Sequence, residues 1–330
     1  MSGSITWLSR RSTSVRSSDP WSHSRCYRGI LRSMLKRLLV VFDAIKIAHS
    51  VFALPFALAA MLVAAGGWPS WRVVGLIVLC MVAARSAAMA FNRWADRKID
   101  ARNPRTQNRP SVSGALSPGF LLGFVIVSSL VFVGGAWLLN HTCFLLAIPT
   151  LAVLLGYSYA KRFTSLSHFW LGLALGLAPI GAHLAVLGNL EPLAGLGVRH
   201  GTGIEWFPVL LGFSVLLWTA GFDLIYACQD YEVDRADAKL HSLPKALGIR
   251  GALWCSAILH VLCVGLLVLA GWYAGLGIWY FGALTLTAAL LTYEHWIVRP
   301  DDLSRVNVAF FTLNGSVSLL IFAAVIVEKM

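Results

Sequence analysis

Charge is scarce in this sequence. Only 13% of its 330 residues are Asp, Glu, Lys or Arg, whereas a soluble globular domain carries about 25%. Hydrophobic residues make up 58% of the chain and the mean hydropathy is +0.72, so too little polar surface remains to cover a water-soluble globule. These proportions exclude a soluble enzyme and a disordered chain, and they indicate a polytopic membrane protein.

Cysteine is sparse as well, and its spacing excludes two kinds of site. The six cysteines include no C-x-x-C pair, and all except Cys26 lie in apolar stretches. Neither a cysteine metal centre nor a secreted disulfide framework is therefore expected. We interpret these cysteines as small buried hydrophobic residues.

Long apolar runs dominate what is present. Nine runs are each about 20 residues long, enough to cross a bilayer as a helix. They cover 44–66, 71–92, 118–139, 142–160, 166–188, 206–228, 251–271, 273–294 and 307–328. The sequence therefore predicts an all-α polytopic membrane protein, a bundle of nine transmembrane helices.

The net charge of +12 follows the membrane topology and does not indicate nucleic-acid binding. Four loops carry 14 Lys and Arg residues together, and the opposite set of loops carries only Arg199. The basic loops are 93–117, 161–165, 229–250 and 295–306. Because cytoplasmic loops are enriched in Lys and Arg, we expect a cytoplasmic N-terminus and a C-terminus on the opposite side of the inner (plasma) membrane. The lipid bilayer is the expected partner, and no protein partner can be inferred.

Residues 1–36 form a separate basic segment rich in Ser and Arg. We interpret it as a disordered cytoplasmic tail or as sequence upstream of the true start, for which Met34 is the candidate. Residues 37–330 then form the nine-helix domain.

Carboxylates at helical spacing mark two of the cytoplasmic loops, 93–117 and 229–250. Asn92, Asp96 and Asp100 are spaced at four, so on a continuing helix they share one face. Asp223, Asp230 and Asp234 are spaced at seven and four, again on one face. Two facing helix ends of this kind form an oxygen-rich site for Mg²⁺, which takes one or two carboxylates together with water and phosphate oxygens. Flanking cations suit the rest of a diphosphate; they are Arg97, Lys98, Arg102, Arg105, Lys161 and Arg162.

The paired motifs resemble those of the UbiA superfamily of intramembrane aromatic prenyltransferases. Supporting stretches are Asn108-Arg109-Pro110, Tyr157 before Lys161-Arg162, and Tyr226-Ala227 before Asp230. Phe52–Ala57 and Ala90–Arg93 are similar to the bacterial branch associated with the futalosine route to menaquinone. Many members have Asp directly after the motif Asn, where this chain has Arg93, and we read this as a trait of that branch.

This resemblance implies a UbiA-type fold and a Mg²⁺-dependent transfer of a polyprenyl group from its diphosphate to an aromatic carboxylic acid. It implies that Asp96, Asp100, Asp230 and Asp234 hold Mg²⁺ and carry the catalysis. Asn92 and Asp223 would support that site, Lys161 and Arg97 would bind the diphosphate, and Tyr157 and Tyr226 would line the site. The acceptor would be 4-hydroxybenzoate or a dihydroxynaphthoate, on the path to ubiquinone or menaquinone.

Two further residues carry expectations. Arg85 is a lone charge inside the second apolar run, seven residues before Asn92, and we expect it to bind the acceptor's carboxylate. A helix-pairing or snorkelling arginine is the alternative. Glu294, near the end of the eighth run, is expected to lie in solvent.

Two alternative functions stay open at this level. One keeps the superfamily and changes the acceptor to haem, chlorophyllide or a lipid glycerol ether, none of which Arg85 favours. The other is a cation-coupled transporter, which would need acids near the bilayer midplane, whereas the acids here cluster at one interface.

Overall fold

The computed structural model describes residues 52–187, 198–199, 203–204 and 206–330. The tail 1–36 and the first part of the predicted helix 44–66 therefore lie outside the described residues. The described elements are α2 (Leu54–Ala65), α3 (Trp71–Ala95), α4 (Arg97–Asp100), α5 (Pro118–Leu139), α6 (His141–Ala160), α7 (Ser167–Leu187), β1 (Val198–Arg199), β2 (Gly203–Ile204), α8 (Trp206–Ala227), the 3₁₀ turn η3 (Cys228–Asp230), α9 (Tyr231–Ala236), α10 (Leu243–Tyr273), α11 (Ile278–Ile297), the π-helix η4 (Val308–Leu313) and α12 (Asn314–Lys329).

Local sequence explains where several of these helices begin and bend. Ser117 begins α5 by accepting a hydrogen bond from the amide of Phe120, and Pro118 occupies the first helical position, where no amide donor is needed. Asn140 caps α6 in the same way. Helix α10 begins before the predicted run, at Leu243, and bends at Gly248, whose φ of 73° suits glycine.

Seven helical stretches in the described part are long and apolar enough to cross a membrane. They contain α3, α5, α6, α7, α8, α10, and η4 with α12. The remaining two predicted spans coincide with α2, of which 12 residues are described, and with the 20-residue α11. The all-α polytopic fold is confirmed, and the count of nine spans stays a prediction.

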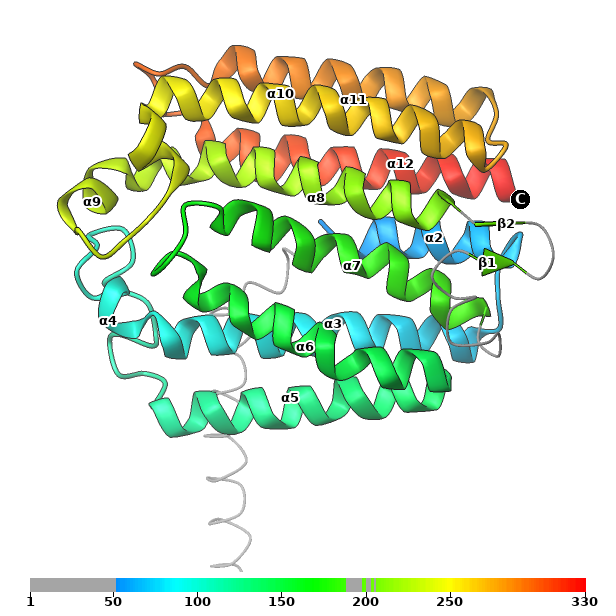
Figure 1. The fold of residues 1–330 in the computed structure, drawn as a ribbon, viewed down its shortest axis with the longest axis horizontal. Coiled ribbons are helices and arrows are strands. Elements are labelled where there is room, and N and C mark those ends of the chain that lie inside the picture. The colour runs from blue at the N-terminus through cyan, green and yellow to red at the C-terminus, as the bar shows by residue number, and fades with distance from the viewer. Residues whose placement is uncertain (1–51, 188–197, 200–202, 205) are drawn as a thin grey trace, which may run out of the picture.

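The long helices run roughly side by side, and the short elements lie at the two ends of the bundle (Figure 1). Helices α4 and α9, which follow α3 and α8, lie at one end. The β1–β2 pair and the C-terminus lie at the other end. The fold therefore brings the two aspartate motifs to the same end, although 130 positions separate Asp100 from Asp230 in the chain.

Large apolar side chains fill the centre between α2, α8 and α12. Phe56, Trp218 and Phe222 are almost completely buried, and Trp218 contacts both phenylalanine rings edge to face, which adds to the stability from their buried area. The same core continues along α12 through Val317 and Ile321.

Helices α7 and α8 approach closely through glycine. A Cβ atom on Gly172 would lie 2.4 Å from the carbonyl oxygen of Leu216, and one on Gly176 would lie 2.5 Å from that of Gly212. Both contacts are with backbone atoms that cannot move aside independently. The small residues therefore set how near the two helices lie.

We expect Gly172→Ala to destabilise the bundle by about 1–3 kcal/mol, the usual cost of overpacking. Gly123→Ala on α5 is the matched control, since no atom lies within 4 Å of its added methyl group. Thermal unfolding in detergent measures both variants. Equal unfolding temperatures for the two would contradict the close-packing interpretation.

Candidate active site

A polar cavity of about 170 Å³ lies at the end of the bundle that carries α4 and α9. The last turns of α3, α6 and α8, together with the segments that follow them, form its wall. Its carboxylates are Asp96, Asp100, Asp223, Asp230 and Asp234, and its cations are Arg93, Arg105, Arg109 and Lys161. Carboxylates and cations thus share a single small space.

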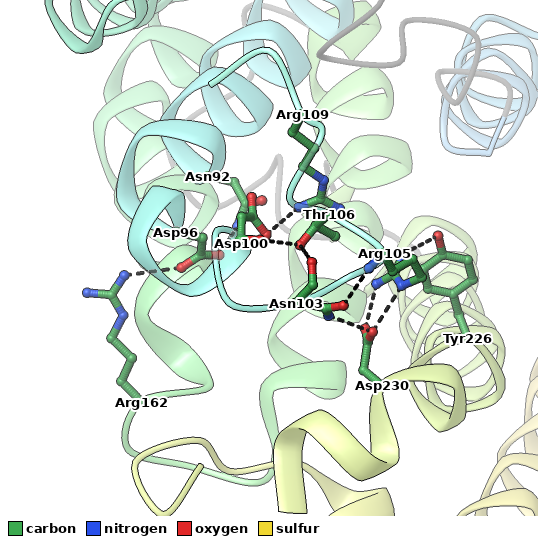
Figure 2. A network of polar contacts seen from close by, with 10 residues as sticks. All are labelled: Asn92, Asp96, Asp100, Asn103, Arg105, Thr106, Arg109, Arg162, Tyr226 and Asp230. Carbon is green, nitrogen blue, oxygen red and sulfur yellow. Dashed lines mark hydrogen bonds and ion pairs between the residues drawn. The ribbon is translucent and has the colours of Figure 1, made fainter. Parts of the chain in front are cut away.

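The first motif lies where α3 ends. The helix stops at Ala95 because Asp96 takes φ −91° and ψ 5°, and Asp100 belongs to the separate turn α4. A helix continuing through Asp100 is therefore not what forms. Asn92 Nδ2 donates to Asp96 Oδ2 over 2.8 Å, and Arg162 Nη2 donates to Asp96 Oδ1 over 3.1 Å. These contacts tie the end of α3 to the connection between α6 and α7 (Figure 2).

Asp100 faces a different arginine. Arg109 Nη1 lies 2.6 Å from Asp100 Oδ1, and the hydroxyl of Thr106 donates to the Asp100 carbonyl oxygen over 2.9 Å. Asp100 is only 6% exposed, and its Oδ2 atom has no hydrogen-bond partner among the described residues. One oxygen of this buried carboxylate is therefore available to a ligand.

The second motif is joined to the loop after α4 through Asp230. Arg105 donates two hydrogen bonds to this carboxylate: Nε lies 2.9 Å from Oδ1, and Nη2 lies 2.5 Å from Oδ2. Asn103 Nδ2 donates to Oδ1 over 2.9 Å, and Arg105 Nη1 donates to the hydroxyl of Tyr226 over 2.9 Å. A bidentate charge-assisted pair fixes both position and direction. This network, drawn in Figure 2, links the two aspartate motifs.

Asp223 and Asp234 complete the set of cavity carboxylates. Asp234 is 4% exposed, and its Oδ2 has no partner among the residues that the structure describes. Asp223 Oδ2 lies 2.6 Å from His168 Nδ1 of helix α7. The sequence offers no signal for this pair, because 55 positions separate the two residues.

Two pKa shifts follow from these surroundings. Burial raises the pKa of Asp96; the hydrogen bond from Arg162 offsets part of the rise, and the nearby charge of Asp100 adds to it. Burial lowers the pKa of Arg105, but its hydrogen bonds to Asp230 outweigh this and leave the pKa raised. Arg105 is therefore a permanent cation. A further positive charge near Asp96 would stabilise the ionised form of its carboxylate.

The donor set suits a hard divalent cation shared with a ligand. In the described part of the chain no three His, Cys, Asp or Glu side chains converge closely enough to form a protein-only metal site. The orphan oxygens of Asp100 and Asp234 are nevertheless carboxylate donors, and both residues line the cavity. Mg²⁺ is commonly held by one or two carboxylates and completes its shell with water and phosphate oxygens.

A second cavity of about 390 Å³ lies deeper in the bundle and is mostly apolar. Helices α3, α5, α6 and α7 form most of its wall. Arg85 lines it, and the Nε atom of Arg85 is buried without a hydrogen-bond partner among the described residues. Asn92 and Tyr157 line both cavities, so the polar and apolar spaces meet at these two side chains.

Most of the residues singled out from the sequence line one of the two cavities. In the polar cavity are Asn92, Asp96, Asp100, Tyr157, Lys161, Asp223, Tyr226, Asp230 and Asp234. Arg85 lies in the apolar one. Arg97 is exposed and lines neither cavity, because the chain turns at Asp96 and directs residue 97 outward. Arg109, Asn103 and His168 carry contacts that the sequence reading did not assign.

The expectation for Glu294 is wrong. Its side chain is completely buried, and its Oε1 atom accepts a hydrogen bond from Asn314 Nδ2 over 2.8 Å. Asn314 begins α12, which packs against the end of α11 that carries Glu294. A residue near the end of a helix is therefore not necessarily exposed, because another helix can cover that end.

Comparison with known proteins gives a consistent result. The model of the UbiA prenyltransferase family matches residues 53–316. The 4-hydroxybenzoate octaprenyltransferase of Nitrosomonas eutropha is 30% identical over 273 residues, covering 81% of this chain and 87% of the relative. That of Xanthomonas campestris pv. campestris is 32% identical over 267 residues, covering 81% and 83%.

Solved structures agree with this match. The apo structure of a UbiA homolog from Aeropyrum pernix K1 is 34% identical, with a TM-score of 0.76 over 86% of this chain and 99% of that one. A UbiA homolog from Archaeoglobus fulgidus bound to GPP and Mg²⁺ has a TM-score of 0.66, over 87% of this chain and 99% of that one. Its identity is 19%, so this second likeness shows the fold alone.

Proposed function

Because the chain belongs to the UbiA prenyltransferase family, we propose that it transfers a polyprenyl group from a polyprenyl diphosphate to an aromatic carboxylic acid, with 4-hydroxybenzoate as the first candidate. The protein is a prenyltransferase with several membrane-spanning helices. The curated relatives named above are 4-hydroxybenzoate octaprenyltransferases, which supports this acceptor. A dihydroxynaphthoate, on the route to menaquinone, is the second candidate.

One observation carries the proposal: the polar and apolar cavities meet at Asn92 and Tyr157. A polyprenyl diphosphate has a highly charged head and a long apolar tail. Cations and carboxylates in one space and an apolar wall in the next match these two parts. We assign the head to the cavity of Asp100 and Asp230, and the tail to the space that Arg85 lines.

Four carboxylates of the polar cavity would bind the metal. Asp96, Asp100, Asp230 and Asp234 would hold Mg²⁺, and the orphan oxygens of Asp100 and Asp234 support this. Bound there, Mg²⁺ would supply Lewis-acid stabilisation of the charge on the departing diphosphate. The Archaeoglobus fulgidus homolog with GPP and Mg²⁺ shows that a protein of this fold accepts both.

The chain's own cations act on the diphosphate oxygens. Lys161 lines the polar cavity, and its charge acts on both Asp96 and Asp230. Arg105 and Arg109 are held in place by their carboxylate partners, so their remaining N–H groups are oriented before the substrate arrives. Donors fixed in advance stabilise developing negative charge without reorganising.

The reaction needs no protein nucleophile. The allylic C–O bond to the diphosphate breaks, and an electron-rich ring carbon ortho to the phenol forms the new C–C bond. The ring carbon then loses its proton and aromaticity returns. Arg85 would hold the acceptor's carboxylate away from the diphosphate, because it lies seven residues, or two turns, before Asn92 on α3.

The alternative acceptors and the transporter function account less well for Arg85 and the cavity carboxylates. Haem, chlorophyllide or a lipid glycerol ether as acceptor would also use both cavities, but a glycerol ether offers Arg85 no carboxylate. For a cation-coupled transporter we would expect acids along the bundle, whereas the cavity carboxylates gather at one end. The basic loops support a site facing the cytoplasm, with the N-terminus on that side and the C-terminus opposite.

A paired transfer assay tests the proposal. The purified protein receives geranyl or farnesyl diphosphate, Mg²⁺, and either 4-hydroxybenzoate or 1,4-dihydroxy-6-naphthoate. We expect product with one acid, and we expect EDTA or Asp96→Ala to abolish it. Product with neither acid would overturn the acceptor class, and ion flux in liposomes without prenyl substrate would favour the transporter.

A further inference from the structure

A buried histidine and aspartate form a pair at the wall of the polar cavity. His168 is the second residue of α7 and is completely buried, and its Nδ1 atom lies 2.6 Å from Asp223 Oδ2 on α8. Asp223 lines the cavity, whereas His168 stands behind it. Among the described residues, His168 is the one hydrogen-bond partner of this carboxylate.

This pairing sets Asp223 apart from three other carboxylates of the cavity. Asp96, Asp100 and Asp230 each pair with an arginine, at 3.1, 2.6 and 2.5 Å. A guanidinium stays charged at every physiological pH, so these three carboxylates each face a fixed positive charge. Asp223 instead faces an imidazole, whose charge is not permanent. Asp223 is therefore the one of these four carboxylates that has no arginine partner among the described residues.

His168 acts as the hydrogen-bond donor to the ionised form of Asp223. When Asp223 is ionised, as a proton acceptor must be, its carboxylate only accepts hydrogen bonds, so Nδ1 of His168 then carries the proton of this bond. Its other nitrogen, Nε2, is buried without a partner among the described residues. The imidazole therefore makes one directed contact, which holds Oδ2 of the cavity-lining Asp223.

We propose that Asp223 accepts the ring proton released on prenylation and that His168 is the residue that positions it, an inference that rests on the proposed function. In this step the ring C–H bond breaks after the C–C bond has formed, its electron pair restores the aromatic ring, and the proton moves to Asp223 Oδ1. Asp223 lies on α8, seven residues or about two turns before Asp230. It lines the cavity together with Tyr157, which also reaches the apolar space.

A kinetic isotope effect on the ring hydrogen tests this step. The assay compares 4-hydroxybenzoate with the same acid deuterated at both positions ortho to the phenol. In the wild-type protein proton loss is fast, so we expect equal rates. In His168→Ala we expect kcat to fall about 10²-fold, as for a misplaced general base, with an unchanged KM for the diphosphate and a primary isotope effect.

Two variants serve as matched comparisons. His168→Asn keeps a donor near the position of Nδ1, so it should recover most of the rate and lose the isotope effect. His183→Ala removes another buried histidine of the same helix, far from Asp223, and should show no isotope effect. If His168→Ala does not fold, Asp223→Asn replaces it, because an amide cannot accept the proton.

The outcomes separate this inference from the proposed function. If wild-type protein prenylates the acid and neither His168→Ala nor Asp223→Asn shows an isotope effect, the proton leaves by another route, such as the released diphosphate. The inference is then overturned and the proposed function stands. If wild-type protein prenylates no aromatic acid, both are overturned.

Discussion

Asp230→Asn is expected to lower kcat about 10³-fold, the size of loss seen when one preorganised electrostatic group is removed from an active site. Asp230 accepts two hydrogen bonds from Arg105 and one from Asn103. An amide has one acceptor oxygen and no charge, so it cannot hold the arginine bidentately. Arg105 is then no longer held in the position proposed for binding the diphosphate. The contact that links the two aspartate motifs is also weakened. Steady-state transfer with saturating substrates measures this loss.

Glu232→Gln is the matched control for Asp230→Asn. Glu232 lies on α9 between Asp230 and Asp234, and its side chain is exposed and lines neither cavity. The Glu232→Gln substitution removes one negative charge from the same short segment without touching the cavity. We therefore expect its kcat to stay within a factor of two of wild type. Equal losses in the two variants would show that the net charge of this loop matters and not the contacts of Asp230.

Arg85→Leu is expected to raise the KM for the aromatic acid about 10²-fold, within the 2–5 kcal/mol that an unpaired buried charge costs. Arg85 lines the mostly apolar cavity, and its Nε atom has no partner among the described residues. The acceptor's carboxylate would then enter this space without a cation. The KM for the polyprenyl diphosphate should change little, because its charged head is assigned to the other cavity and its apolar tail needs no cation.

Arg97→Leu controls for the loss of a cation near the site. Arg97 is exposed and lines neither cavity, so both KM values should remain near those of wild type. A rise in both KM values for Arg85→Leu would instead assign Arg85 to helix pairing. A large rise in the diphosphate KM for Arg97→Leu would restore the role expected from the sequence alone.

The sequence predicted that the two carboxylate motifs share one site, although the continuous helices expected to carry them end at Ala95 and Ala227. Asp96 and Asp100 line the same cavity as Asp230 and Asp234. Apolar length likewise predicted the membrane-spanning helices, because backbone groups in lipid must be paired within the segment. The prediction of the spans rests on local helical geometry, which the structure keeps over most of each long helix, whereas both aspartate motifs extend past a helix end.

Where the chain leaves helical geometry, sequence spacing loses its value. The turn at Asp96 directs Arg97 outward, and Arg109, which the sequence analysis did not assign, lines the cavity together with the expected Arg105. The residues near position 96 include no glycine or proline that would predict this turn. The burial of Glu294 and the pairing of His168 with Asp223 depend on helices distant in the chain, which no local pattern contains.

The glycine contact between α7 and α8 also affects the chemistry. Gly172 follows His168 by one turn, and Leu216 precedes Asp223 by two, so the crossing that Gly172 permits lies beside the histidine–aspartate pair. A larger residue at position 172 would push the two helices apart and lengthen the 2.6 Å bond. In a deep mutational scan selected on quinone-dependent growth, Gly172 should therefore score like an active-site residue, although it touches no substrate.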